Sequence, residues 1–300
     1  EGKEDEIIKL VEAGNVSLPL NTSLIRGSSA LFGIRADLQF GKLSVNAVVS
    51  QQESESKTIS LKNGAQKMAF EVDALDYDEN RHFFLAQYFR DNYEKGMSKL
   101  PYVSTGVEIN RVEVWITNKT ANFDQSRNVV AFLDLGETDK IKNTVWTVKT
   151  PGLPSNKANS LYEDVVALDG LRDIDKFNSV MQVAYPESST DVVGGEDYEK
   201  LESARRLNEN EFIVNKQLGY ISLRSQLNAD EVLAVAFEYT YGGKVYQVGE
   251  FSSDGVEAPN ALVLKLIKGT AFSPELPNWD LMMKNVYSLG TSQIQADDFD

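Results

Sequence analysis

Residues 231–251, EVLAVAFEYTYGGKVYQVGEF, decide the fold class. Apolar side chains occupy every second position from Leu233 to Tyr241, which is the period of a β-strand with one buried face. Gly242-Gly243 follows directly, and a two-residue glycine pair between two such runs is typical of a tight hairpin turn. The stretch therefore predicts an antiparallel hairpin.

A second hairpin is predicted at residues 31–49. Apolar residues alternate with polar ones over 31–40 and again over 43–49, and Gly41-Lys42 between them fits a type II′ turn. Such a hairpin has two interpretations. It lines the core of a soluble sheet, or it belongs to a larger β-barrel with its apolar side toward lipid, since strands of about ten residues suit a tilted bilayer crossing.

The rest of the chain mixes short strands with helical patterns. Strands are predicted over 51–61, as an extension of the hairpin, and over 68–72, 107–117, 128–135, 220–223 and 261–267, with a turn at 62–64. Helices are predicted over 80–99, 161–168 and 174–183, the last with Asp173 as N-cap. Residues 185–210 are predicted to be loop-like and mobile, with a short helix over 198–208. The fold class is therefore α+β, predominantly antiparallel, with sandwich-like lobes and hairpins and a few helices; an insert of a larger β-barrel is the second interpretation.

Two lobes are predicted from the clearest turn-forming stretch, PGLPSN at residues 151–156. Residues 1–150 form a β-rich N-terminal lobe that includes the hairpin 31–49. Residues 157–300 form an α+β C-terminal lobe, and residues 151–156 link the two. The chain opens at Glu1 without a methionine, which predicts an internal fragment of a longer protein.

The composition excludes several functions. A net charge of −15 disfavours nucleic acid as a partner, because the phosphate backbone would be repelled. The chain has no cysteine, so disulfides and thiolate metal sites are impossible. No run of eighteen apolar residues is present, so no transmembrane helix is predicted.

The sequence contains no motif that indicates a catalytic site. His82 is the only imidazole, and its aromatic surroundings favour a structural role. Asp76, Asp78 and Asn80 imitate the start of a calcium loop, but Arg81 and Gln87 stand where glycine and glutamate are required. Carboxylate pairs such as Glu196/Asp197 and Asp297/Asp298 favour a solvated acidic face. The sequence predicts a protein that is not an enzyme, with no catalytic, cofactor-binding or metal-binding residue and no cofactor.

Trp115 offers a different class of function. It lies opposite Val112, Val114 and Ile116 on the predicted strand 107–117, so it faces either a binding partner or a second layer of structure. With Trp146 and Trp279 it could stack on a sugar. A cell-surface β-sandwich that binds glycan or protein is therefore the alternative function.

Five blocks of sequence resemble a known family. They are YDENRHFFLAQYFRDNY (77–93), RVEVWITN (111–118), NVVAFLDLGE (128–137), LGYISLRSQLNADEVLAVAFEYTYGGKVYQVGEF (218–251) and NWDLMMKNVYSLG (278–290). In this order they resemble the SprA/Sov family, the giant outer-membrane translocon of type IX secretion and gliding motility. The blocks span most of the chain, which makes the resemblance specific.

The resemblance implies a structural piece of a protein-export channel at the outer membrane of a Gram-negative bacterium, on its extracellular or periplasmic face. The piece would gate or cap the pore through which folded cargo passes. The implied partners are secreted cargo proteins with C-terminal sorting domains, a smaller outer-membrane β-barrel and a plug protein.

Overall fold

The computed structural model describes residues 8–16, 31–40, 43–50, 60–62, 65–67, 71–120 and 123–289. The chain divides into two compact units, Glu1–Glu71 and Val72–Asp300, here called the first and the second unit. Each is described by itself. The α+β class predicted from the sequence is confirmed, with antiparallel strands dominating both units.

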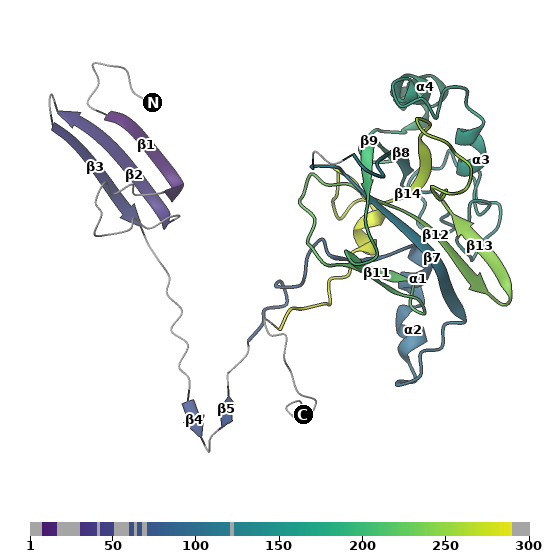
Figure 1. Cartoon of the computed structure of the whole chain (residues 1–300), viewed down its shortest axis with the longest axis horizontal. Helices are drawn as coiled ribbons and strands as arrows, with labels where there is room; N and C mark the ends of the chain where they lie inside the picture. The colour runs from purple at the N-terminus through teal and green to yellow at the C-terminus, as the bar shows by residue number, and fades with distance from the viewer. Residues whose placement is uncertain are drawn as a thin grey trace. The chain divides into compact units, whose positions relative to one another are not determined.

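The first unit contains a three-stranded antiparallel sheet (Figure 1). Its strands are β1 (Ile8–Val16), β2 (Leu31–Phe40) and β3 (Leu43–Ser50), in the order β1-β2-β3. The predicted hairpin 31–49 is confirmed, with Phe40 opposite Leu43 at its closed end. Residues 41–42, and most of the predicted extension over 51–61, lie outside the described residues.

A short strand pair completes the described part of the first unit. It consists of β4 (Ser60–Lys62) and β5 (Ala65–Lys67), which flank the predicted turn at 62–64. Most of the predicted strand 68–72 lies outside the described residues, and Glu71 and Val72 are not in a strand.

The second unit is built on a closed five-stranded barrel. Its strands are β7 (Val107–Ile116), β8 (Arg127–Phe132), β9 (Tyr198–Arg206), β12 (Leu233–Tyr241) and β14 (Leu262–Lys268). They follow the order β12-β14-β8-β9-β7, and β7 pairs back onto β12 along its whole length. Only β14 and β8 run parallel. Closure removes the exposed edges that an open sheet would present.

Strand β13 (Lys244–Val248) extends β12 as the predicted hairpin (Figure 1). Gly242 and Gly243 both have positive φ angles, as a type I′ turn requires. The predicted strands over 107–117, 128–135, 220–223 and 261–267 are confirmed with small changes at their ends.

The barrel separates two hydrophobic clusters. One contains Trp115, Ala131, Ala204 and Ala236 with residues from all five strands and the loops at their ends, and it fills the barrel interior. The other lies on the outside of the barrel, where helical side chains such as Phe177 cover it. Because both faces are covered, every residue of β14 is buried.

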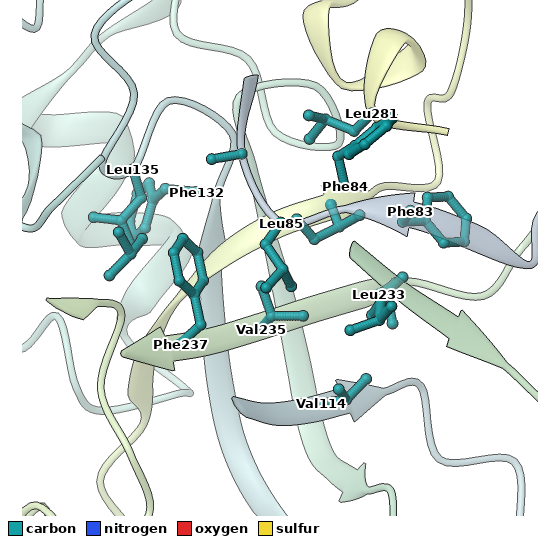
Figure 2. Packing of buried hydrophobic residues seen from close by; sticks show 14 of the residues in the cluster. Phe83, Phe84, Leu85, Val114, Phe132, Leu135, Leu233, Val235, Phe237 and Leu281 are labelled. Atoms are coloured by element: carbon teal, nitrogen blue, oxygen red, sulfur yellow. The ribbon is translucent and has the colours of Figure 1, made fainter. Parts of the chain in front are cut away.

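The aromatic segment after residue 77 covers the outer cluster. It forms β6 (His82–Phe84), which pairs with β11 (Tyr220–Leu223) beside β10 (Phe212–Asn215), and then two short helices, α1 (Gln87–Asp91) and α2 (Tyr93–Met97). Figure 2 shows Phe83, Phe84 and Leu85 gathered with side chains of β7, β8 and β12. The single helix predicted over 80–99 is therefore wrong in its first turns, which form a strand.

The helices of the second unit are short and differ in part from the predictions. They are α3 (Leu161–Val166), α4 (Phe177–Ala184), α5 (Glu187–Thr190) and a 3₁₀ helix, η1 (Pro277–Leu281). The N-cap of α4 is Lys176 and not Asp173. Asp173 instead closes the preceding turn, where its carboxylate accepts a hydrogen bond from the Asp175 N–H.

The prediction of a mobile segment with a short helix over 198–208 is wrong, because these residues form the central strand β9. Ser203 has a φ of 51° and the register with β8 shifts there, which marks a β-bulge. The extra residue brings Leu201 and Ala204 to the same interior cluster. Their spacing of three residues imitates a helix in the sequence.

The loop 151–156 is not a linker between lobes in this fold. The Asn156 N–H donates to the Gln247 carbonyl (2.8 Å), and the Tyr239 hydroxyl donates to the Pro154 carbonyl (2.8 Å). Strands on both sides of the loop belong to one barrel. The structure places the division between units at residues 71 and 72 instead.

Candidate functional site

An exposed apolar surface on the β2–β3 hairpin is the first candidate site. Phe40, Leu43 and Val45 are 50%, 61% and 37% exposed, and we call these three residues the hairpin face. Phe40 lies opposite Leu43, and Leu38 lies opposite Val45, so the register gathers apolar residues on one side of the sheet. In the described part of the first unit, β1 and β3 each pair only with β2. Open edges and an exposed apolar face are features of a sheet that is completed by another structure.

A groove in the second unit is the other candidate site. It has a volume of about 1020 Å³ and lies between α4, α5 and β9, and we call it the α4–β9 groove. Its lining consists of Asn178, Gln182, Tyr185, Pro186, Glu187, Ser188, Asp191, Val192, Gly194, Gly195, Tyr198, Glu199 and Lys200.

Tyr198 lines the groove and is held in place by close packing contacts. Its ring packs edge-on against Phe177, with 5.3 Å between centroids, and the Gly194 backbone lies so close that a Cβ there would be 3.2 Å from the Tyr198 hydroxyl. Burial raises the pKa of the Tyr198 hydroxyl, and the Asp197 and Glu187 carboxylates raise it further. Negative charge therefore lies near this wall.

His82 has a structural position on β6. Its Nδ1 is 2.8 Å from the Ser222 hydroxyl on β11, and its Nε2 is 3.4 Å from the Asp78 carboxylate. Burial lowers the pKa of His82, although the hydrogen bond that the imidazole donates to the Asp78 carboxylate opposes that shift. Ser222 is the direct cross-strand partner of His82, so the contact follows from sheet register.

The three residues do form a Ser-His-Asp sequence of contacts that the sequence did not predict, since Ser222 lies 140 positions from His82. The ring nitrogens are reversed relative to the serine protease template, in which Nε2 contacts the serine. None of the three residues lines the α4–β9 groove. The contact between His82 and Ser222 therefore joins two strands, and it lies apart from the α4–β9 groove.

The acidic turn 76–80 directs its side chains to separate partners. Asp76 accepts a hydrogen bond from the Asp73 N–H, whereas Asp78 contacts Arg81 and His82. Across the described residues, no group of three or more histidines and carboxylates is arranged to hold a metal ion.

Trp115 does not form a sugar-binding surface. It is 1% exposed and packs in the barrel interior. The polar residues on its side of β7 lie at the barrel end, where Glu113 contacts Arg111 (2.9 Å) and accepts hydrogen bonds from the Ser252 backbone and hydroxyl. Of its two predicted environments, the second layer of structure is the one observed.

One family model matches a stretch of the chain that includes both the hairpin and most of the second unit. A family model described as a motility related/secretion protein, SprA_N, matches residues 2–227. The chain belongs to this family. The match covers the hairpin face and the α4–β9 groove, and it includes the blocks at 77–93, 111–118 and 128–137. Among curated proteins, none matches the chain.

The SprA_N description concerns motility and secretion and names no catalysis. In the part of the chain that the structure describes, no helix is long and apolar enough to cross a membrane.

The block NVVAFLDLGE of this SprA_N chain ends in a buried polar network. Lys265 and Glu137 are 1% and 4% exposed, and the Lys265 ammonium lies 2.8 Å from the Glu137 carboxylate. The Gln87 N–H donates to the same carboxylate (3.1 Å). Asn159 donates to the carbonyls of Asp134 (2.7 Å) and Glu137 (3.0 Å). The network joins β8, β14, α1 and the loop before α3.

Asp134 joins this network through its backbone carbonyl, which accepts from Asn159. Its carboxylate accepts hydrogen bonds from the N–H groups of Lys142 and Asn143, at 3.0 and 2.9 Å. Burial raises the pKa of Asp134 to about 6 in spite of these bonds. The sequence identified the block as family-like, but it gave no sign that these acids are buried.

Proposed function

We propose that this chain is a structural, non-catalytic part of an outer-membrane protein-export translocon, the type IX secretion and gliding machinery. It would gate or cap the pore through which folded cargo passes. Membership of a family of motility and secretion proteins supports this proposal. The observation that carries it in the structure is the hairpin face, because an apolar surface on a sheet whose edge strands have no further pairing among the described residues favours association with a partner.

The proposal includes the environment and the partners. The chain would act at the outer membrane of a Gram-negative bacterium, on its extracellular or periplasmic face. Secreted cargo proteins with C-terminal sorting domains would pass it, and a smaller outer-membrane β-barrel and a plug protein would contact the same assembly. The acidic charge of −15 would keep nucleic acid away.

Detergent dependence of the purified chain tests the proposal. We expect the intact chain to associate in plain buffer, and to become monomeric in mild detergent or after removal of residues 31–49. Analytical ultracentrifugation measures both states. A chain that is monomeric in plain buffer and loses its fold without residues 31–49 would assign the hairpin to a soluble core and sink the proposal.

Point substitutions test the same proposal without deleting residues 31–49. Phe40→Ser, Leu43→Ser and Val45→Ser together would make the hairpin face polar. The matched control replaces three exposed apolar residues of the second unit, Leu100→Ser, Tyr102→Ser and Ile213→Ser. Association should disappear in the first variant and persist in the second.

The alternative function is a cell-surface binding module for glycan or protein. The α4–β9 groove is the observation that favours it, since Trp115 is buried and gives no support. A chain that is monomeric without detergent, and that binds a surface component through the groove, would favour this alternative.

A further inference from the structure

The α4–β9 groove has an uncompensated negative charge. Its lining contains the carboxylates of Glu187, Asp191 and Glu199 and the single ammonium of Lys200. Lys200 lies 2.7 Å from Glu202, so its charge is already paired. Glu199 accepts hydrogen bonds from the Thr270 N–H and hydroxyl.

Glu187 and Asp191 are the two acids of the groove that remain available. Both are exposed, and neither has an ion-pair partner within the described residues. The neighbouring acids Glu196 and Asp197 both bind Lys142, at 2.9 and 2.7 Å, and therefore do not compete for an incoming cation.

The groove also offers an aromatic wall and a hydrogen-bond donor. Tyr198 is held between Phe132 and Phe177, and its hydroxyl has no hydrogen-bond partner among the residues that the structure describes. Tyr185 lines the same groove and packs against Trp146, with 5.8 Å between ring centroids. Packing against buried neighbours fixes the two tyrosine side chains. Little side-chain entropy is therefore lost when a ligand binds against them.

The volume of about 1020 Å³ is at the upper end for a small-molecule site. Gly194 and Gly195 leave the backbone accessible on one side. A groove of this size has room for a few residues of extended chain as well as for one long side chain.

We propose that the α4–β9 groove binds a cationic segment of a partner polypeptide, with an arginine between Glu187 and Asp191 and a backbone carbonyl accepting from the Tyr198 hydroxyl. Arginine suits the site because its planar guanidinium pairs with carboxylates and stacks on aromatic rings. A neutral glycan could donate hydroxyl hydrogen bonds to the two carboxylates but would form no ion pair with them, and an acidic ligand would be repelled. This inference stands independently of the export role.

Fluorescence anisotropy with a labelled nonapeptide tests the inference. The probe is a glycine-serine peptide that contains two arginines, and its control contains citrulline at both positions, which keeps the shape and removes the charge. At about 150 mM salt, where exposed long-range attractions are largely screened, we expect the arginine peptide to bind at least about tenfold more tightly than the citrulline peptide.

Matched variants distinguish peptide binding by the groove from general attraction to the negative net charge of the chain. Glu187→Gln with Asp191→Asn should weaken binding about tenfold, since two partly exposed charge contacts are lost. Glu209→Gln with Glu257→Gln removes the same charge from exposed positions outside the groove and should leave binding unchanged within twofold. Tyr198→Phe removes only the hydroxyl and should weaken binding by a smaller factor.

Four results would overturn the inference. Equal weakening by the two double variants would show attraction to net charge alone. Equal binding of the arginine and citrulline peptides would show that charge is not recognised. Absence of binding up to millimolar peptide, or tighter binding of a neutral oligosaccharide in competition, would exclude a cationic polypeptide as the ligand.

Discussion

The two units use the same sequence pattern and reach opposite results. In the second unit, strands such as β12 alternate apolar residues, and the sheet closes so that both faces are buried. In the first unit, β2 alternates in the same way, yet Phe40 and its neighbours on β3 stay exposed. Period-two patterning therefore specifies a strand and its faces, whereas closure of the sheet specifies what covers them.

Tryptophan fluorescence distinguishes the unfolding of the two units. Trp115, Trp146 and Trp279 all belong to the second unit, so tryptophan fluorescence reports the unfolding of that unit alone. Changes in the first unit can then be followed by association.

The largest effect is expected for Trp115→Ala. The indole fills the interior of a closed barrel that cannot collapse around the cavity, so the free energy of unfolding should fall by about 5 kcal/mol. Urea unfolding followed by the fluorescence of the two remaining tryptophans measures it. Phe40→Ala on the hairpin face is the control and should leave the same transition in place. A small loss for Trp115→Ala would show that the barrel interior is loosely packed.

Glu137→Ala should cost about 4 kcal/mol, because it leaves the Lys265 ammonium buried without its carboxylate. The double change Glu137→Leu with Lys265→Met removes both charges and should recover most of that loss. Glu163→Ala breaks an exposed pair with Lys149 and should not move the urea midpoint. Failure of the double variant to recover would assign the loss to packing and not to charge.

Asp134 should give the second unit a pH dependence of its own. Its pKa of about 6 lies above the ordinary value of 3.8, so the native state holds a proton that the unfolded state has released between these pH values. Stability should therefore fall as the pH rises from about 4 to 6, on the order of 3 kcal/mol in total. Asp134→Asn is neutral at every pH and should abolish this fall.

His82 acts in the other direction and must be separated from Asp134. Its pKa is lowered below 6.5, so the unfolded state binds its proton first and stability falls as the pH drops below that value. Subtracting the pH profile of Asp134→Asn from that of the unchanged protein leaves the Asp134 contribution. An unchanged profile in Asp134→Asn would contradict the raised pKa.

The sequence predicted the regular strands well because local alternation survives in them. The hairpins at 31–49 and 231–251, and the strand at 107–117, all contain runs in which every second residue is apolar, such as Val112, Val114 and Ile116. Barrel closure could not be predicted, since the pairing of β7 with β12 joins residues such as Val114 and Val235 that lie far apart in the chain. The sequence left the environment of Trp115 open between a binding partner and a second layer of structure, because it does not show that Glu113 on the same strand face is buried among ion pairs.

The groove was missed for a different reason. All of its lining residues lie between positions 178 and 200, in a stretch that resembles a mobile acidic loop. The available signal was the placement of Tyr185 and Tyr198 on either side of Gly194-Gly195, since aromatic residues in an acidic loop need packing partners. The bulge at Ser203 concealed β9 by giving Leu201 and Ala204 a helical spacing.

The smallest change in stability is expected for Val45→Thr on the hairpin face. Threonine keeps the β-branched shape and strand propensity of valine, and Val45 is already 37% exposed, so the fluorescence-detected transition of the second unit should not move. Association of the chain should nevertheless weaken, because a hydroxyl replaces a methyl group at the contact. Sedimentation across a concentration series measures that change. If Val45→Thr left association unchanged while the Phe40, Leu43 and Val45 triple variant abolished it, the contact would be centred on the aromatic end of the hairpin. If neither change had an effect, the open sheet of the first unit would tolerate its exposed apolar face, and the contrast with the closed barrel would be one of geometry alone.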